Sequence, residues 1–263
     1  LSGGNLVETH RRVLAVCRLN TSGRKSGELY ELARPITNLG IGVRSCGIVD
    51  AACSRESEIA RSLAVRRPIG RNPLSKSSLS LTYGQAFVAP DLHRHRSSMS
   101  VQIPQGEQLF SKGGCALISD STWRNSIAKQ AGDLSVRGFL ADYYSTPDHW
   151  DVKTSATRVL RALNSWCHSQ SGYIEGGSYI CSLSAMIFHQ HDAHLFHMGD
   201  TLVYRIRGAE FEQLTRDHVT DLGGYRYPSR ALGMDGHVDI DYSTFPLKQG
   251  DLFLFMTQAV RGT

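Results

Sequence analysis

The chain has 263 residues, a mass of 29.0 kDa and a formal net charge of +5 at pH 7, and this length suits one large domain or one domain with an appended segment. A hydrophobic content of 41% with 20% charged residues is ordinary for a globular protein and excludes a wholly disordered or collagen-like chain. Since no apolar run approaches the roughly 20 residues of a membrane-spanning helix, we expect no membrane contact and a cytoplasmic location.

The cysteines are spread along the chain without the Cys-x-x-Cys spacing of metal or redox sites. We expect reduced thiols, as is usual in a cytoplasmic protein, and a disulfide remains the alternative. The six cysteines are Cys17, Cys46, Cys53, Cys115, Cys167 and Cys181.

The basic character is concentrated at the N-terminus, where residues 1–78 carry 13 Lys and Arg against 6 Asp and Glu. Arg11–Cys17 is a candidate for the start of a short helix, and Glu56–Val65 has a helical stripe of apolar residues. A Pro-, Gly- and Ser-rich stretch ending at Ser80 is typical of a linker. We therefore predict that residues 1–78 are a basic, partly disordered extension without an assigned function, ahead of a domain at 79–263.

Two basic clusters in this extension, Arg24-Lys25 and Arg66-Arg67, contain the residue types that contact nucleic-acid phosphates. No aromatic side chains are interleaved with them to stack on bases. A solvated surface is therefore the favoured interpretation, and we do not expect nucleic acid as a partner.

The domain that follows alternates between strand and helix patterns. Leu81–Gln85 and Ser111–Asp120 are predicted strands, and the mostly apolar run Tyr179–Phe188 suits a strand buried on both faces. Apolar residues at helical spacing from Ile127 to Leu140 predict one helix that ends at Asp142–Tyr144, and a more strongly amphipathic helix is predicted over Val152–Cys167.

Two strands around a turn follow next. His194–Met198 alternates polar and apolar residues, Gly199-Asp200 has turn chemistry, and Leu202–Ile206 resumes the alternation. Gly208 marks a second turn, and Leu252–Thr257 is a further apolar strand near the C-terminus.

Three motifs in this region resemble the metal-dependent protein phosphatases (PPM type, phosphatase 2C). They are MGDTLVYRIRG, EQLTRDH and the Ser229–Gly233 segment SRALG, which stand in the family's order and spacing. The segment GFLADYYSTPDHWDVKTSATRVLRALNSW is most similar to bacterial proteins in which this domain precedes a protein kinase. The resemblance implies an α+β fold, a four-layer α-β-β-α sandwich of two antiparallel sheets. It also implies that the last strands and the kinase half would follow Thr263, so that the domain is C-terminally incomplete.

The resemblance further implies hydrolysis of phosphoserine or phosphothreonine by water activated between two Mn or Mg ions, held by several carboxylates. Asp120 falls on the family's first Asp-Gly, with Ser121 in place of the glycine and its carbonyl as a second metal ligand. Ser97 stands where the first acidic residue is expected, and Gln258 where a late aspartate is expected.

Arg94 and Arg96 are the candidates for the family's phosphate-binding arginine, whose own position falls on Asp91. Two divalent ions carry a charge of about +4, which one certain aspartate does not offset. We therefore predict one weak metal site or none, and an impaired phosphatase. The alternative is a pseudophosphatase that binds a phosphoprotein or a linked or cognate protein kinase.

Four closely spaced histidines raise the alternative of a zinc site, but no thiol or carboxylate completes a tetrahedral set. They are His189, His191, His194 and His197. In the resembling family the last of them, together with Asp217-His218, is part of the scaffold. Asp200 is expected to bond backbone groups at its turn.

Overall fold

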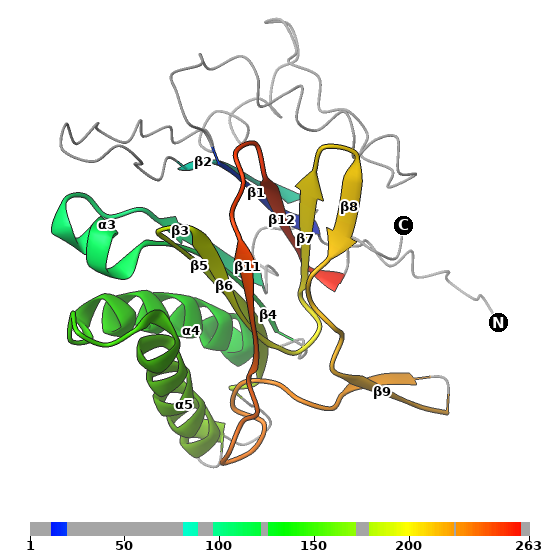
Figure 1. The fold of residues 1–263 in the computed structure, drawn as a ribbon. Coiled ribbons are helices and arrows are strands. Elements are labelled where there is room, and N and C mark those ends of the chain that lie inside the picture. Colours follow the sequence, from blue (N-terminus) through cyan, green and yellow to red (C-terminus); the bar gives the residue numbers. More distant parts are fainter. Residues whose placement is uncertain are drawn as a thin grey trace, which may run out of the picture.

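The computed structural model describes residues 12–19, 81–88, 97–121, 126–171, 179–223 and 225–258. Two five-stranded antiparallel sheets lie face to face, with helices against one of them (Figure 1). The first sheet has the order β2 (Leu81–Val88), β1 (Arg12–Leu19), β12 (Leu252–Met256), β7 (Leu202–Arg207) and β8 (Glu210–Gln213). The second has the order β11 (Asp241–Pro246), β6 (Asp192–Met198), β5 (Cys181–His189), β4 (Gly114–Ser121) and β3 (Ser97–Gln102).

The helices are α3 (Glu107–Lys112), α4 (Ser126–Ser145) and α5 (Val152–Ser171), and a small ribbon pairs β9 (Val219–Leu222) with β10 (Tyr225–Pro228). Helices α4 and α5 cover the outer face of the second sheet (Figure 1). None of the described helices is both long and apolar enough to cross a membrane.

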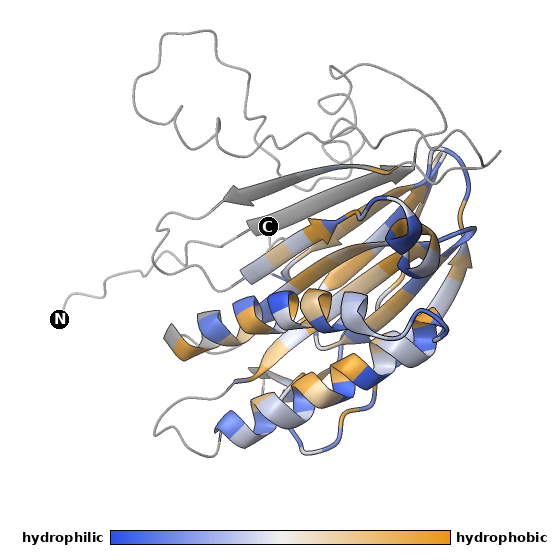
Figure 2. Cartoon of the chain, turned by 90° about the vertical axis from the view of Figure 1, so that its left-hand side faces the viewer, coloured by the Kyte–Doolittle hydropathy of each residue, from blue (hydrophilic) through white to orange (hydrophobic). Residues whose placement is uncertain are grey.

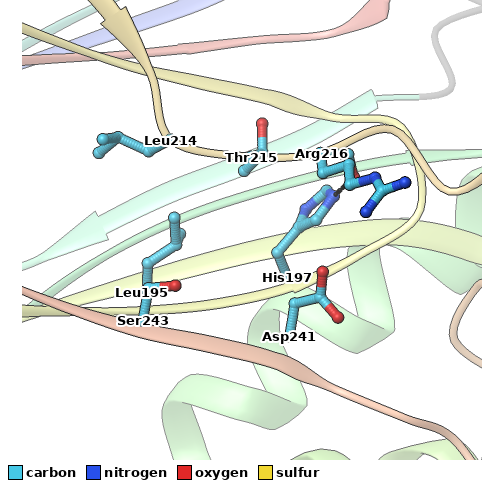
Figure 3. Close-up of a pocket in the computed structure, with 7 residues that line it drawn as sticks. All are labelled: Leu195, His197, Leu214, Thr215, Arg216, Asp241 and Ser243. Atoms are coloured by element: carbon cyan, nitrogen blue, oxygen red, sulfur yellow. Dashed lines mark hydrogen bonds between the residues drawn. The ribbon is translucent and has the colours of Figure 1, made fainter.

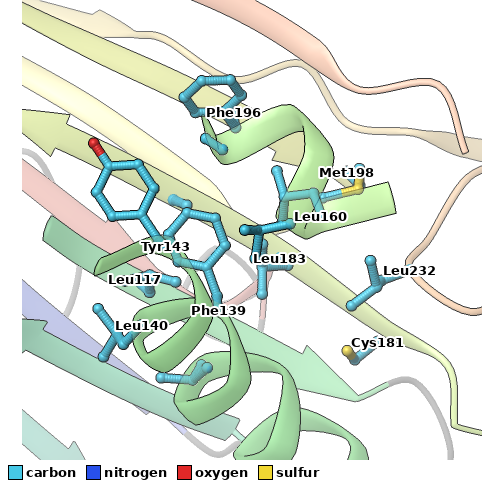
Figure 4. Close-up of a cluster of buried hydrophobic side chains, with 14 of the residues drawn as sticks. Leu117, Phe139, Leu140, Tyr143, Leu160, Cys181, Leu183, Phe196, Met198 and Leu232 are labelled. Carbon is cyan, nitrogen blue, oxygen red and sulfur yellow. The ribbon is translucent and has the colours of Figure 1, made fainter. Parts of the chain in front are cut away.

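Two hydrophobic clusters hold the layers together, and Figure 2 shows hydrophobic residues along the strands and on the helices. Figure 4 shows the cluster between the helices and the second sheet, where Phe139 and Leu160 meet Leu117 and Leu183. The cluster between the two sheets includes Ala116, Ile118, Met186, Phe188, Leu195, Phe253 and Phe255. The two packed antiparallel sheets and their helices confirm the α+β sandwich, with three of the four expected layers in the described ranges.

The alternation along β4 decides which side chains face the gap between the sheets. Cys115 and Leu117 belong to the helix-side cluster, whereas Ala116 and Ile118 belong to the cluster between the sheets. Because side chains alternate with a period of two along a strand, Asp120 also faces the space between the sheets.

Strand β1 corrects two expectations about the N-terminal segment. Arg12–Leu19 is a strand rather than the start of a helix, and it pairs with both β2 and β12, Leu14 lying opposite Met256. The sheet therefore includes part of the segment 1–78 that we expected to lie outside the domain. The predicted helix at Glu56–Val65 and the rest of that segment lie outside the described residues.

Helix α3 corrects the start of the predicted strand at Ser111. Ser111 and Lys112 are helical, and Gly113, with φ of 75°, ends the helix before β4 begins. The Gly113 N–H donates to the carbonyl of Leu109 at 3.0 Å, as at many helix C-termini that end in glycine.

The cysteines whose side chains are described, Cys115, Cys167 and Cys181, are buried free thiols. Burial raises the pKa of Cys115 and Cys167 to about 12, so both remain protonated at neutral pH.

Candidate functional site

Asp120 lies near the end of β4 with serines opposite it on both neighbouring strands. Ser97 of β3 and Ser182 of β5 are its cross-strand partners. The Ser97 hydroxyl donates to Asp120 Oδ1 at 2.8 Å. The carboxylate that the sequence places at a metal site is therefore flanked by hydroxyl-bearing residues.

Ser121 follows Asp120, but its side chain points to the other face of the sheet. It is buried and donates to the carbonyl of Ile180 at 3.1 Å. The prediction for Ser121 concerns its carbonyl as a metal ligand, and it stays a prediction.

Gln258 lies two residues after β12, the central strand of the first sheet. Its Nε2 donates to Asp217 Oδ2 at 3.4 Å. Met256 lies opposite Leu202, the first residue of β7, which follows the Gly199-Asp200 turn almost directly. The register therefore places Gln258 at the same end of the sandwich as Asp120 and this turn.

Ser182 holds the Gly199-Asp200 turn from the side. Its hydroxyl donates to Asp200 Oδ1 at 2.6 Å and accepts from the Asp200 N–H at 3.1 Å. The expectation that the Asp200 carboxylate bonds backbone groups is thus corrected, because its described partner is a side-chain hydroxyl. Gly199 has φ of 103° and lies so close to Ser182 that any side chain there would overlap it.

His197 of β6 joins the second sheet to the segment that follows β8. Its Nε2 faces the carbonyl of Arg216 at 3.0 Å, so this nitrogen carries the proton, and Nδ1 accepts from the Ser184 hydroxyl at 2.8 Å. Burial, followed by the nearby His218, lowers the pKa of His197 to about 4. His197 is therefore neutral near pH 7 and is structural, as the resemblance implied.

His218 also holds the Gly199-Asp200 turn in place. Its Nδ1 accepts the Gly199 N–H at 3.0 Å, and its Nε2 donates to Asp241 Oδ2 at 2.9 Å. Arg230 binds the other oxygen of Asp241. Burial opposes ionisation of Asp241, but the hydrogen bonds from His218 and Arg230 outweigh it and hold its pKa below the usual range.

A pocket of about 190 Å³ opens beside these histidines, between β6, β11 and the segment after β8. Figure 3 shows the His197 ring between Arg216 and Asp241. The lining residues are Leu195, His197, Leu214, Thr215, Arg216, Asp241 and Ser243.

The zinc alternative is not supported by the contacts of the histidines. His189 Nε2 faces the carbonyl of Phe110 at 3.0 Å, and His194 Nδ1 bonds the Tyr242 hydroxyl at 2.9 Å. Nowhere in the described part of the chain do three or more His, Cys, Asp or Glu side chains gather where they could hold a metal ion.

The described residues do not fit the two-ion centre that the resemblance implies. Such a centre needs several carboxylates to offset the charge of the cations. Of the expected ligand positions among the described residues, Asp120 is a carboxylate, while Ser97 and Gln258 are neutral. Arg94 and Arg96, the predicted phosphate-binding residues, lie outside the described residues.

No protein-family profile and no curated protein matches the chain in sequence. Among solved structures, the serine/threonine phosphatase Stp1 from Staphylococcus aureus is similar with a TM-score of 0.50, covering 64% of this chain and 91% of Stp1 at 9% identity. The chain has the PPM-type phosphatase fold.

Two further structures with this PPM-type fold are similar over a comparable share. PppA, a regulatory component of T6SS in Pseudomonas aeruginosa, has a TM-score of 0.48 at 17% identity and covers 60% of this chain and 74% of PppA. The Mycobacterium tuberculosis phosphatase PstP/Ppp has a TM-score of 0.47 at 20% identity and covers 61% of this chain and 77% of its own.

Sequence reasoning missed several residues that build this end of the PPM-type fold. Ser182 and Asp241 were given no role from the sequence, and Arg230 was noted only as part of the SRALG motif. The strand register and the turn contacts bring the three residues to the Gly199-Asp200 turn, which the sequence pattern alone does not show.

Proposed function

We propose that this chain is a protein serine/threonine phosphatase-type domain in which hydrolysis by metal-activated water is impaired. The PPM-type fold supports the phosphatase assignment, and Asp120 supports a site derived from a metal-binding one. The proposal that hydrolysis is impaired rests on the Ser97–Asp120 pair, in which a hydroxyl donor lies 2.8 Å from the carboxylate. We expect phosphoserine or phosphothreonine proteins as substrates or partners in the cytoplasm.

The physical reason is charge. Bound cations would supply the nucleophile for such hydrolysis by lowering the pKa of a water molecule to about 7. Hard cations replace their hydration shell only where anionic oxygens compensate for it. A serine hydroxyl and a glutamine amide at positions 97 and 258 supply dipoles rather than charges.

Hydrolysis of a phosphothreonine peptide in manganese tests the proposal. Asp120→Ala removes the retained carboxylate. Asp133→Ala is the matched control, because Asp133 also accepts a hydrogen bond from a β3 serine, Ser98 at 2.7 Å, but lies on helix α4. We expect background turnover in all three proteins. If the unmodified chain turns over the peptide, and Asp120→Ala abolishes this turnover while Asp133→Ala keeps it, a working metal centre is present. The proposed impairment of hydrolysis would then be wrong.

A pseudophosphatase is the second candidate, favoured by the same Ser97–Asp120 hydrogen bond. In this role the domain binds a phosphoprotein, or a linked or cognate protein kinase, without turnover. Fluorescence anisotropy with a phosphothreonine peptide and its unphosphorylated twin measures this directly. Equal affinity for the two peptides would argue against phosphate recognition.

A further inference from the structure

Two positions that the family fills with metal-binding carboxylates carry hydrogen-bond donors here, and each donor is directed at a carboxylate. The Ser97 hydroxyl donates to Asp120 at 2.8 Å, and the Gln258 amide donates to Asp217 at 3.4 Å. In each pair a donor provides part of the compensation that a cation would otherwise provide to the carboxylate.

We propose that Ser97 and Gln258 make this end of the sandwich independent of divalent cations, so that the domain folds and binds phosphoprotein without metal. This inference rests on the proposed phosphatase-type function with impaired hydrolysis. It adds that the two substitutions do more than delete ligands, because they install an internal replacement for the bound ions.

The cross-strand geometry gives the first reason. Ser97 and Asp120 are direct partners in the antiparallel ladder, and both face the gap between the sheets. An acidic residue at position 97 would set two carboxylates opposite each other, which destabilises a sheet unless a cation lies between them. A serine removes that repulsion and adds a charge-assisted hydrogen bond.

The chemistry of the amide gives the second reason. A carboxylate accepts but does not donate, so the Gln258 amide has to turn its nitrogen toward Asp217. Among the residues that the structure describes, its Oε1 then has no hydrogen-bond partner and is buried. Such an atom carries a cost, which indicates that the donor end of the side chain fixes its orientation.

The first test compares the melting temperature of the unmodified chain in EDTA and in millimolar manganese, with manganese binding followed by isothermal titration calorimetry. We expect the same melting temperature in both solutions and no heat of binding. A clear rise of the melting temperature in manganese, with saturable binding, would overturn the proposal, since a ligand that binds only the folded state stabilises it.

The second test introduces the missing charge. Ser97→Asp should lower the melting temperature in EDTA, and manganese should restore it. Ser98→Asp is the matched control, because Ser98 bonds Asp133 in the same way but toward helix α4. An equal manganese effect in both variants, or none in folded Ser97→Asp and folded Gln258→Asp, would contradict the inference.

The measurements distinguish failure of the metal-independent site from failure of the proposed impaired hydrolysis. Manganese binding by the unmodified chain without hydrolysis would refute the proposal of a metal-independent site. The proposal of an impaired phosphatase would still stand. Manganese-dependent hydrolysis that needs Asp120 would remove the proposed impairment, and the inference would fall with it. Anisotropy of the phosphothreonine peptide in EDTA completes the set, with expected affinity unchanged when manganese is added.

Discussion

Lowering the pH from about 7 to about 4.5 should destabilise the domain through His197, because its ring is buried in the neutral form. The side chain is 2% exposed, and its pKa falls from 6.5 to about 4 through burial and the neighbouring His218. Above pH 6.5 the ring is neutral in both the folded and the unfolded chain, so it adds no pH dependence. Between 6.5 and 4 the unfolded chain takes up the proton and the folded one does not.

The magnitude follows from the two pKa values. At about 1.36 kcal/mol per pKa unit, the difference between 6.5 and about 4 corresponds to roughly 3 kcal/mol of lost stability below pH 4. About 2.5 kcal/mol of it is already lost near pH 4.5. The loss comes from the unfolded state, and the native hydrogen bonds to Ser184 and Arg216 stay in place.

Urea unfolding at several pH values measures this effect, with His197→Gln as the comparison. Glutamine keeps a donor for the Arg216 carbonyl and an acceptor for the Ser184 hydroxyl but does not titrate. We expect a shallower loss of unfolding free energy in the variant between pH 6.5 and 4.5. His194, whose pKa burial also lowers, contributes equally to both proteins. Identical pH profiles would refute the reasoning.

Two further substitutions test the packing of the sandwich. Gly199→Ala should cost at least about 2 kcal/mol in urea unfolding, because the residue has φ of 103° and its methyl would overlap Ser182; a variant as stable as the parent would contradict this close approach. Asp251→Asn should cost roughly 3 kcal/mol, since Asp251 is fully buried and accepts two hydrogen bonds from Arg207 at 2.7 Å. A loss that high salt removes would indicate a solvent-screened pair instead.

The sequence located the elements whose signals are local. The amphipathic pattern over Val152–Cys167 is contained in α5, and the helical spacing at Ile127–Leu140 is contained in α4. The Gly199-Asp200 turn and the apolar strand β12 also lie where they were predicted. Periodicity and turn chemistry act over a few residues, so they can be read without the fold.

Strand β1 is an element that the local sequence does not predict. A short apolar run such as Val13–Cys17 has no periodicity that separates strand from helix. Its neighbours in the sheet are β2 and β12, far away along the chain, and only their backbone groups make it a strand. The environment of Asp120 has the same origin. The sequence supplied Asp120, Ser97 and Ser182, but the register of three strands, which depends on non-local pairing, brought them side by side.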